Sequence, residues 1–120
     1  MDTADLLKRM ERERHFWVPL AEGKRLKMLR PLVDEAGDFG NDFSIGRVSR
    51  YVIGWDGLVE SDFLKTGGSE PVEYDKRLAS ALLRDHIGWA TAVAQAISRE
   101  MSEQVKRTED VEKNSETSST

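Results

Sequence analysis

The chain has 120 residues, of which 38% are hydrophobic and 33% charged, and its formal net charge is −4. These values predict one globular domain, and the negative charge argues against nucleic acid as a partner, because phosphates favour a basic surface. Cysteine is absent, which excludes disulfides, thiolate nucleophiles and thiolate metal sites. We expect no signal peptide and no membrane span, since the longest largely apolar run, Ile87 to Ser98, is far shorter than the ~20 residues required. A cytoplasmic location is expected.

The first predicted element is a helix near residues 3–14, with Thr3 as its N-cap candidate. Leu6, Leu7 and Met10 form a narrow apolar stripe, and the surrounding charges suit the helix dipole. Two interpretations stay open for this stripe. It belongs either to a solvated amphipathic helix or to an arm that docks on a partner.

A β-hairpin is predicted for residues 16–30, in which Phe16–Leu20 pairs with Arg25–Leu29 around a turn at Gly23. Pro19 has no backbone N–H to donate, so it has to lie on an edge strand or at a bulge. A lone hairpin is marginally stable in water, and one of its faces is therefore expected to pack on helices.

Two polar clusters follow from the spacing of charges in this region. Arg25 and Lys27 alternate with apolar residues and so share one face of their strand, which is either solvated or an anion-binding surface. The acidic segment 34–42 lacks the spacing of a calcium-binding loop, and no metal site is expected there.

A second helix is predicted near residues 42–53, because apolar residues recur at helical spacing between Ile45 and Val52. Asn41 or Asp42 can cap its N-terminus.

The sequence Gly54-Trp55-Asp56-Gly57 is predicted to be a structural anchor. Gly54 is expected to end the preceding helix, and Asp56-Gly57 is a turn dipeptide. Trp55 lies between the two glycines and is expected to fill the core where the chain reverses direction.

Two further helices are predicted after the loop 60–70. Asp75 is the N-cap of a helix at 76–84, and a longer helix near 86–104 follows a break at Asp85. The side chains expected to be largely buried are Trp55, Leu82, Leu83, Trp89, Val93 and Ile97.

The apolar positions of these two helices cover more than one stripe, so they form either core alone or core together with a partner surface. The residues predicted to bind a partner are Leu83, Ile87, Trp89, Val93 and Ile97. The same surface predicts self-association. Beyond Met101 the apolar pattern stops, and residues 102–120 are expected to be a disordered polar tail. We therefore predict an α+β, mostly α-helical domain over residues 1–101, with one β-hairpin packed on helices.

No pattern of catalytic residues is evident. His15 and His86 are far apart in the sequence, and neither belongs to a metal-binding spacing. A nucleophile elbow of the GxSxG type is absent. We expect neither an enzyme nor a bound cofactor.

Three motifs follow each other between residues 15 and 100: Val52-Ile53-Gly54-Trp55-Asp56-Gly57-Leu58, Pro71-Val72-Glu73-Tyr74-Asp75, and Leu82-Leu83-Arg84-Asp85 followed by Trp89. This order resembles the tail assembly chaperones of long-tailed bacteriophages, minor tail proteins encoded ahead of the tape measure protein. The resemblance implies a protein that binds the tape measure protein, helps to recruit the tail tube protein, self-associates, and is absent from the finished particle. The implied location is the host cell cytoplasm.

Two other functions stay open from the residues. One is a structural or connector interaction module that remains in a phage particle. The other is a nucleic-acid-binding regulator that would use the basic side chains Arg25, Lys27, Arg30, Arg47 and Arg50.

Overall fold

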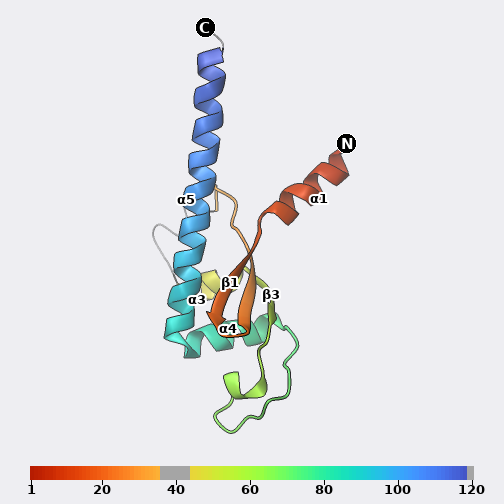
Figure 1. Ribbon diagram of the computed structural model, residues 1–120, viewed down its shortest axis with the longest axis vertical. Helices are drawn as coiled ribbons and strands as arrows, with labels where there is room; N and C mark the ends of the chain where they lie inside the picture. Colours follow the sequence, from red (N-terminus) through yellow and green to blue (C-terminus); the bar gives the residue numbers. More distant parts are fainter. Residues whose placement is uncertain (36–43, 119–120) are drawn as a thin grey trace.

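A computed structural model of the chain describes residues 1–35 and 44–118. The described part is an α+β fold that is mostly helical, as the sequence predicts (Figure 1). Its helices are α1 (Thr3–Glu13), α3 (Ile45–Ser49), α4 (Lys76–Asp85) and α5 (Ile87–Ser118), with a single 3-10 turn at Glu60–Asp62. Its strands, β1 (His15–Ala21), β2 (Lys24–Leu29) and β3 (Val52–Asp56), form one antiparallel sheet in the order β1-β2-β3.

The predicted hairpin is confirmed as β1 and β2. Phe16 lies opposite Met28, and the register shifts between Pro19 and Ala21. Pro19 therefore lies on an edge strand and beside an irregularity, the two places that tolerate a missing N–H. The turn contains Gly23, whose φ of +75° favours glycine.

The prediction of one helix over 42–53 is wrong at its C-terminal end. The helix α3 ends at Ser49, and Val52–Asp56 forms β3 along the free edge of β2, with Trp55 opposite Leu26. The run before Trp55 is β-branched and aromatic, and an unpaired neighbouring strand can satisfy its backbone groups. Ser44 is the N-cap of α3, whereas the predicted start at Asp42 and the predicted caps Asn41 and Asp42 lie outside the described residues.

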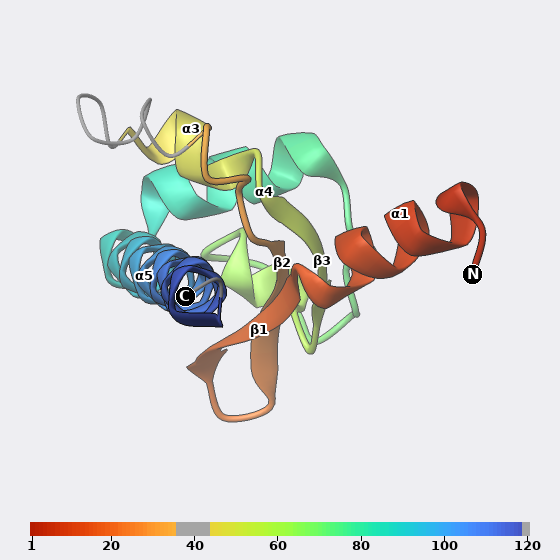
Figure 2. The ribbon, with the colours of Figure 1, turned by 90° about the horizontal axis from the view of Figure 1, so that it is seen from above.

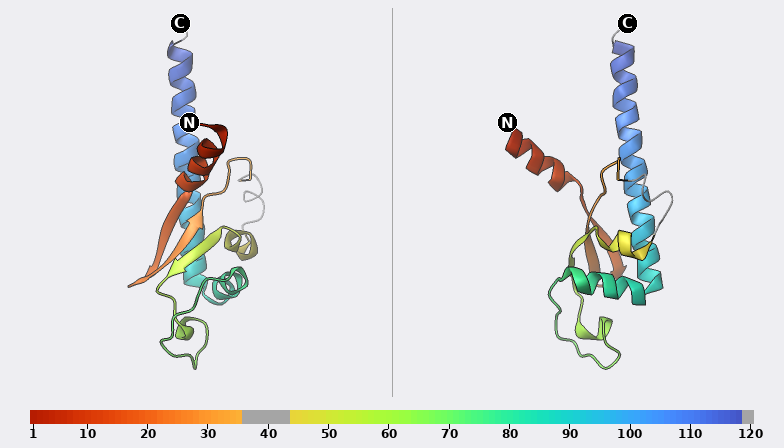
Figure 3. Two further views of the ribbon diagram at one scale, coloured as in Figure 1. Left: turned by 90° about the vertical axis from the view of Figure 1, so that its right-hand side faces the viewer. Right: turned by 180° about the vertical axis from the view of Figure 1, so that it is seen from behind.

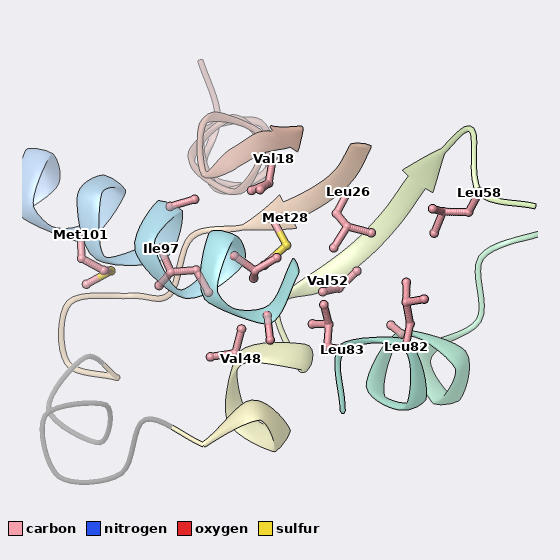
Figure 4. Close-up of a cluster of buried hydrophobic side chains, with 14 residues drawn as sticks. Val18, Leu26, Met28, Val48, Val52, Leu58, Leu82, Leu83, Ile97 and Met101 are labelled. Atoms are coloured by element: carbon pink, nitrogen blue, oxygen red, sulfur yellow. The ribbon is translucent and has the colours of Figure 1, made fainter. Parts of the chain in front are cut away.

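The core lies between one face of the sheet and the helices α3, α4 and α5. Figure 4 shows Leu26, Met28 and Val52 of the strands facing Val48 and Leu83 of the helices. Burial is confirmed for Leu82, Leu83, Val93 and Ile97 but not for Trp55 and Trp89, which are half-buried at the border of the core. The core also contains residues that the sequence did not single out, namely Val18, Leu26, Met28, Val48, Val52 and Leu58.

The long helix α5 continues to Ser118, where the sequence predicted a helix ending near 104 and a disordered tail (Figure 1). The predicted helix end near 104 is therefore wrong, whereas the disorder expected for residues 102–120 stays a prediction, and residues 119–120 lie outside the described part of the chain. The predicted helix end depended only on the loss of the apolar pattern beyond Met101. Acidic and basic residues in this stretch repeat at helical spacing, as Glu103 and Arg107 do, and such pairs stabilise a solvent-exposed helix.

The first helix, α1, points away from the rest of the fold and from α5 (Figures 1 and 2). None of its side chains is buried. Its N-cap is Asp2 and not the predicted Thr3, since an Asp2 carboxylate oxygen accepts the Asp5 N–H at 2.8 Å.

Candidate functional site

The predicted anchor, Gly54-Trp55-Asp56-Gly57, holds the segment after β3 against the sheet. The Trp55 indole donates a 2.7 Å hydrogen bond to the Val72 carbonyl, and its ring lies 5.7 Å from that of Phe63. Trp55 thus connects β3 to both ends of the segment between β3 and α4, which is a structural role.

The turn predicted at Asp56-Gly57 is confirmed by a φ of +81° at Gly57. Gly54, in contrast, has ordinary strand geometry, because it lies opposite Lys27 within the sheet and does not end a helix. Asp56 is exposed and pairs with Arg25 at 2.9 Å.

The predicted partner-binding residues do not form one surface. Leu83, Val93 and Ile97 are almost fully buried among core side chains, so they are unavailable to a partner in this structure. Trp89 stacks on the His86 ring at 4.2 Å. Ile87, the first residue of α5, is 81% exposed.

A different surface combines exposed apolar side chains with a concave shape. It is a groove of about 980 Å³ between α1 and α5, which we call the α1–α5 groove. The two helices diverge on either side of it (Figure 3). Its apolar lining comes from Leu7 and Met10 of α1 and from Leu32 and Val33 after β2, and each of these side chains is between 45% and 60% exposed.

Arginines gather at the base of the α1–α5 groove. Arg14 donates a 2.8 Å hydrogen bond to the Arg30 carbonyl, and Arg107 of α5 lines the same groove. Burial and the neighbouring charges of Arg14 and Arg107 lower the pKa of Arg30, which Glu100 partly opposes. Carboxylates outnumber the arginines in this groove, since its lining also contains Glu11, Glu13, Asp34, Glu100 and Glu103.

One wall of the groove is braced by an ion pair and a hydrogen-bond relay. Glu35 accepts a 2.7 Å hydrogen bond from the Tyr51 hydroxyl and a 2.9 Å bond from the Leu32 N–H, and lies 3.9 Å from Arg14. Because of the Tyr51 and Leu32 hydrogen bonds, the pKa of Glu35 lies below its ordinary value. These contacts fix the loop that presents Leu32.

The apolar stripe of α1 is one half of this groove, and its sequence pattern did suggest a docking arm. Sequence reasoning missed Leu32 and Val33. The available signal was a pair of apolar residues placed between Pro31 and an acidic segment, where burial in the core is not expected.

The basic residues considered for nucleic acid binding lie in three separate places. Arg25 and Lys27 flank the exposed ring of Trp17 on the outer face of the sheet, at 3.7 Å and 5.9 Å from its centroid. Arg30 lies in the α1–α5 groove, and Arg47 and Arg50 lie at α3. The structure does not bring the five together.

Comparisons of the chain with models of protein families, with curated proteins and with solved structures found no match. None of the helices in the described part of the chain combines the length and apolar character that crossing a membrane requires. In residues 1–35 and 44–118, no three His, Cys, Asp or Glu side chains gather where they could hold a metal ion.

Proposed function

We propose that this chain is a binding protein without catalytic activity, which holds an amphipathic helix of a partner in the α1–α5 groove. The observation that carries the proposal is an amphipathic helix, α1, that buries none of its side chains while Leu7 and Met10 line a groove. An exposed apolar surface of this kind is typical of an interaction site.

The volume of the groove is large enough for a short helical segment. A volume near 980 Å³ corresponds to about two turns of a helix about 10 Å across. Such a partner would bind with apolar residues at helical spacing against Leu7, Met10 and Leu32.

The resemblance to tail assembly chaperones of long-tailed bacteriophages suggests which protein supplies the helix that binds in the groove. We propose that the partner is the tape measure protein, a long helical chain that needs its apolar faces covered before the tail polymerises. In this proposal the protein acts in the host cell cytoplasm, aids recruitment of the tail tube protein, self-associates when the partner is absent, and leaves before the particle is complete.

Copurification tests the groove as the binding surface. The chain is coexpressed with a long helical fragment of a tape measure protein, as wild type and as the Leu7→Ser/Met10→Ser variant. The matched control is Leu64→Ser/Ile87→Ser, which removes two exposed apolar side chains outside the groove. We expect capture by the wild type and the control and its loss in the groove variant.

Two results would contradict the proposal. Equal capture by the groove variant and the wild type would exclude the α1–α5 groove as the binding surface. Loss of capture in the control alone would restore the predicted surface around Ile87. Mass spectrometry of purified particles tests the chaperone role separately, because detection of the chain in them would favour a structural component.

A further inference from the structure

A second concave surface lies between α3 and α4 and is lined by basic side chains. This hollow of about 640 Å³, the α3–α4 basic hollow, shares no residue with the α1–α5 groove. Its cationic lining consists of Arg47, Arg50, Lys76, Arg77 and Arg84. Among the described residues, no aspartate or glutamate belongs to its lining. Such a concentration of one charge is unexpected in a chain whose net charge is −4.

The two helices present their basic side chains from opposite walls. On α4, Arg77, Ser80 and Arg84 are spaced by three and four residues, which places them along one side of the helix for about 10 Å. The second wall carries Arg47 of α3 and Arg50, its C-cap. The separation of the walls is therefore set by the packing of two helices.

The core holds these walls in place. Val48 of α3 and Ala79 and Leu83 of α4 belong to the same buried cluster. Ser49, also buried, donates a 2.9 Å hydrogen bond to the Gly46 carbonyl. The two helices that form the walls are thus fixed by the core, whereas exposed side chains such as Arg50 and Arg84 become ordered when a ligand binds.

Most of the positive charge in the hollow is not neutralised. Asp75, the N-cap of α4, forms an ion pair with Arg77, and the two side chains are 3.0 Å apart. Within residues 1–35 and 44–118, no ion pair neutralises Arg50, Lys76 or Arg84. These three cations line one concave surface and attract an anionic ligand to it.

We propose that the α3–α4 basic hollow binds an acidic segment of a partner protein. Arginine forks bind carboxylates through two parallel hydrogen bonds, and arginines outnumber lysines in the hollow by four to one. The hollow extends for about two helical turns, which matches a short run of acidic residues.

Nucleic acid is the less favoured anion. A duplex carries charge over a long distance, and its binding requires a basic surface of comparable extent. The remaining surface of this chain is net negative, because the whole chain carries −4 although the hollow contributes five cations. The rest of the chain would therefore repel a duplex overall.

Fluorescence anisotropy with a short fluorescein-labelled polyglutamate peptide tests the proposal on the full chain. The variant Arg50→Gln/Arg84→Gln removes two cations from the hollow. Its control, Lys65→Gln/Arg99→Gln, removes two exposed cations that line none of the concave surfaces described. We expect saturable binding by the wild type and the control, and a Kd raised about tenfold in the hollow variant, as the loss of two exposed charge pairs predicts.

A second variant, Arg50→Lys/Arg84→Lys, keeps the charge and loses the guanidinium forks, so we expect it to fold like the wild type and to bind with intermediate affinity. In amide NMR spectra the peptide should shift resonances of α3 and α4. The Leu7→Ser/Met10→Ser variant should bind the peptide normally, which separates this inference from the proposed function.

Several outcomes would overturn the inference. These are the absence of saturable binding, an equal loss of affinity in the hollow variant and the control, or peptide-induced shifts confined to other elements. Tighter binding of duplex DNA than of the peptide, with competition between the two, would show that the hollow serves a nucleic acid instead.

Discussion

The ring of Tyr74 stands edge-on to the indole of Trp55, with centroids 5.1 Å apart and planes inclined by 77°. The Tyr74 hydroxyl also donates a 2.6 Å hydrogen bond to the carbonyl of Val52, at the start of β3. Together with the bond from Trp55 to Val72, these contacts fasten the segment before α4 to the edge strand of the sheet. They cover part of an edge that would otherwise expose unpaired backbone groups.

Replacement of Trp55 by alanine should destabilise the domain by about 3 kcal/mol, because the side chain is half-buried and packs on two aromatic rings. Trp55→Phe keeps an aromatic ring and loses the hydrogen bond to Val72, so a cost of about 1 kcal/mol is expected. Urea unfolding measures both values. An alanine variant with the wild-type unfolding midpoint would show that the anchor contributes little to stability and would favour a direct role of Trp55 in binding.

Two glycines with positive φ should respond differently to alanine. Gly23 has open space around it, so Gly23→Ala adds only backbone strain of about 1 kcal/mol. At Gly57 a Cβ would lie 1.9 Å from the Gly23 carbonyl oxygen, and Gly57→Ala should cost more than about 3 kcal/mol. Thermal unfolding of the two variants side by side gives the comparison. Equal losses of stability would mean that the two turns do not approach each other as closely as the structure has them.

The hydrogen bond from Tyr51 to Glu35 should make stability depend on pH. The pKa of Glu35 is lowered by its bonds to Tyr51 and Leu32, so its contribution is present above its unfolded pKa, near 4.5, and is lost as pH falls through the folded value. Burial, followed by the hydrogen bond to Glu35, raises the pKa of Tyr51 from 10.0 to about 12. That contribution is complete below pH 10.0 and is lost as pH rises toward 12.

Tyr51→Phe tests this relationship. At neutral pH the variant should be less stable than the wild type by about 1–2 kcal/mol, as the loss of a partly exposed bond to a charged group predicts. Urea unfolding over a range of pH should show the two proteins converging as the pH falls below 4.5 and through the lowered pKa of Glu35, because that carboxyl then becomes protonated in both. A difference that stays constant down to acid pH would assign the effect to packing and not to the hydrogen bond.

Removal of residues 1–12 should change the free energy of unfolding by less than about 0.5 kcal/mol, because α1 buries no side chain. Isolated helices of this length are marginal in water, so amide hydrogens of α1 should exchange rapidly in the free chain and more slowly once a partner helix fills the groove. Hydrogen exchange with and without the partner measures this. Strong protection of α1 in the free monomer would contradict the described position of the helix.

Removal of residues 109–120 should also leave the unfolding midpoint unchanged while lowering the helical circular dichroism signal. Among the residues of α5 whose burial is described, which end at Lys113, the last buried side chain is Met101, and Val105 and Val111 are exposed. The contribution of this part of the chain to folding stays a prediction until this truncation is measured. A lower midpoint would show that the distal turns of α5 contact the core.

Local physical chemistry in the sequence determined several elements by itself. The apolar periodicity around Leu82 and Val93, the cap at Asp75 and the alternation around Gly23 predicted two helices and a hairpin that the structure confirms. These features depend on neighbours within a few residues, so the relevant interactions can be recognised from spacing alone. The stripe of α1 was recognised in the same way.

Only the tertiary structure decided the roles of Val52 and Leu83. Val52 fits a helical spacing equally well, and becomes part of a strand because the free edge of β2 lies beside it. Leu83 was predicted to bind a partner, but it is buried in the core. Leu7 is also apolar, yet it stays exposed because α1 points away from the core. Burial depends on which elements pack together over long distances in the chain, and no local pattern carries that information.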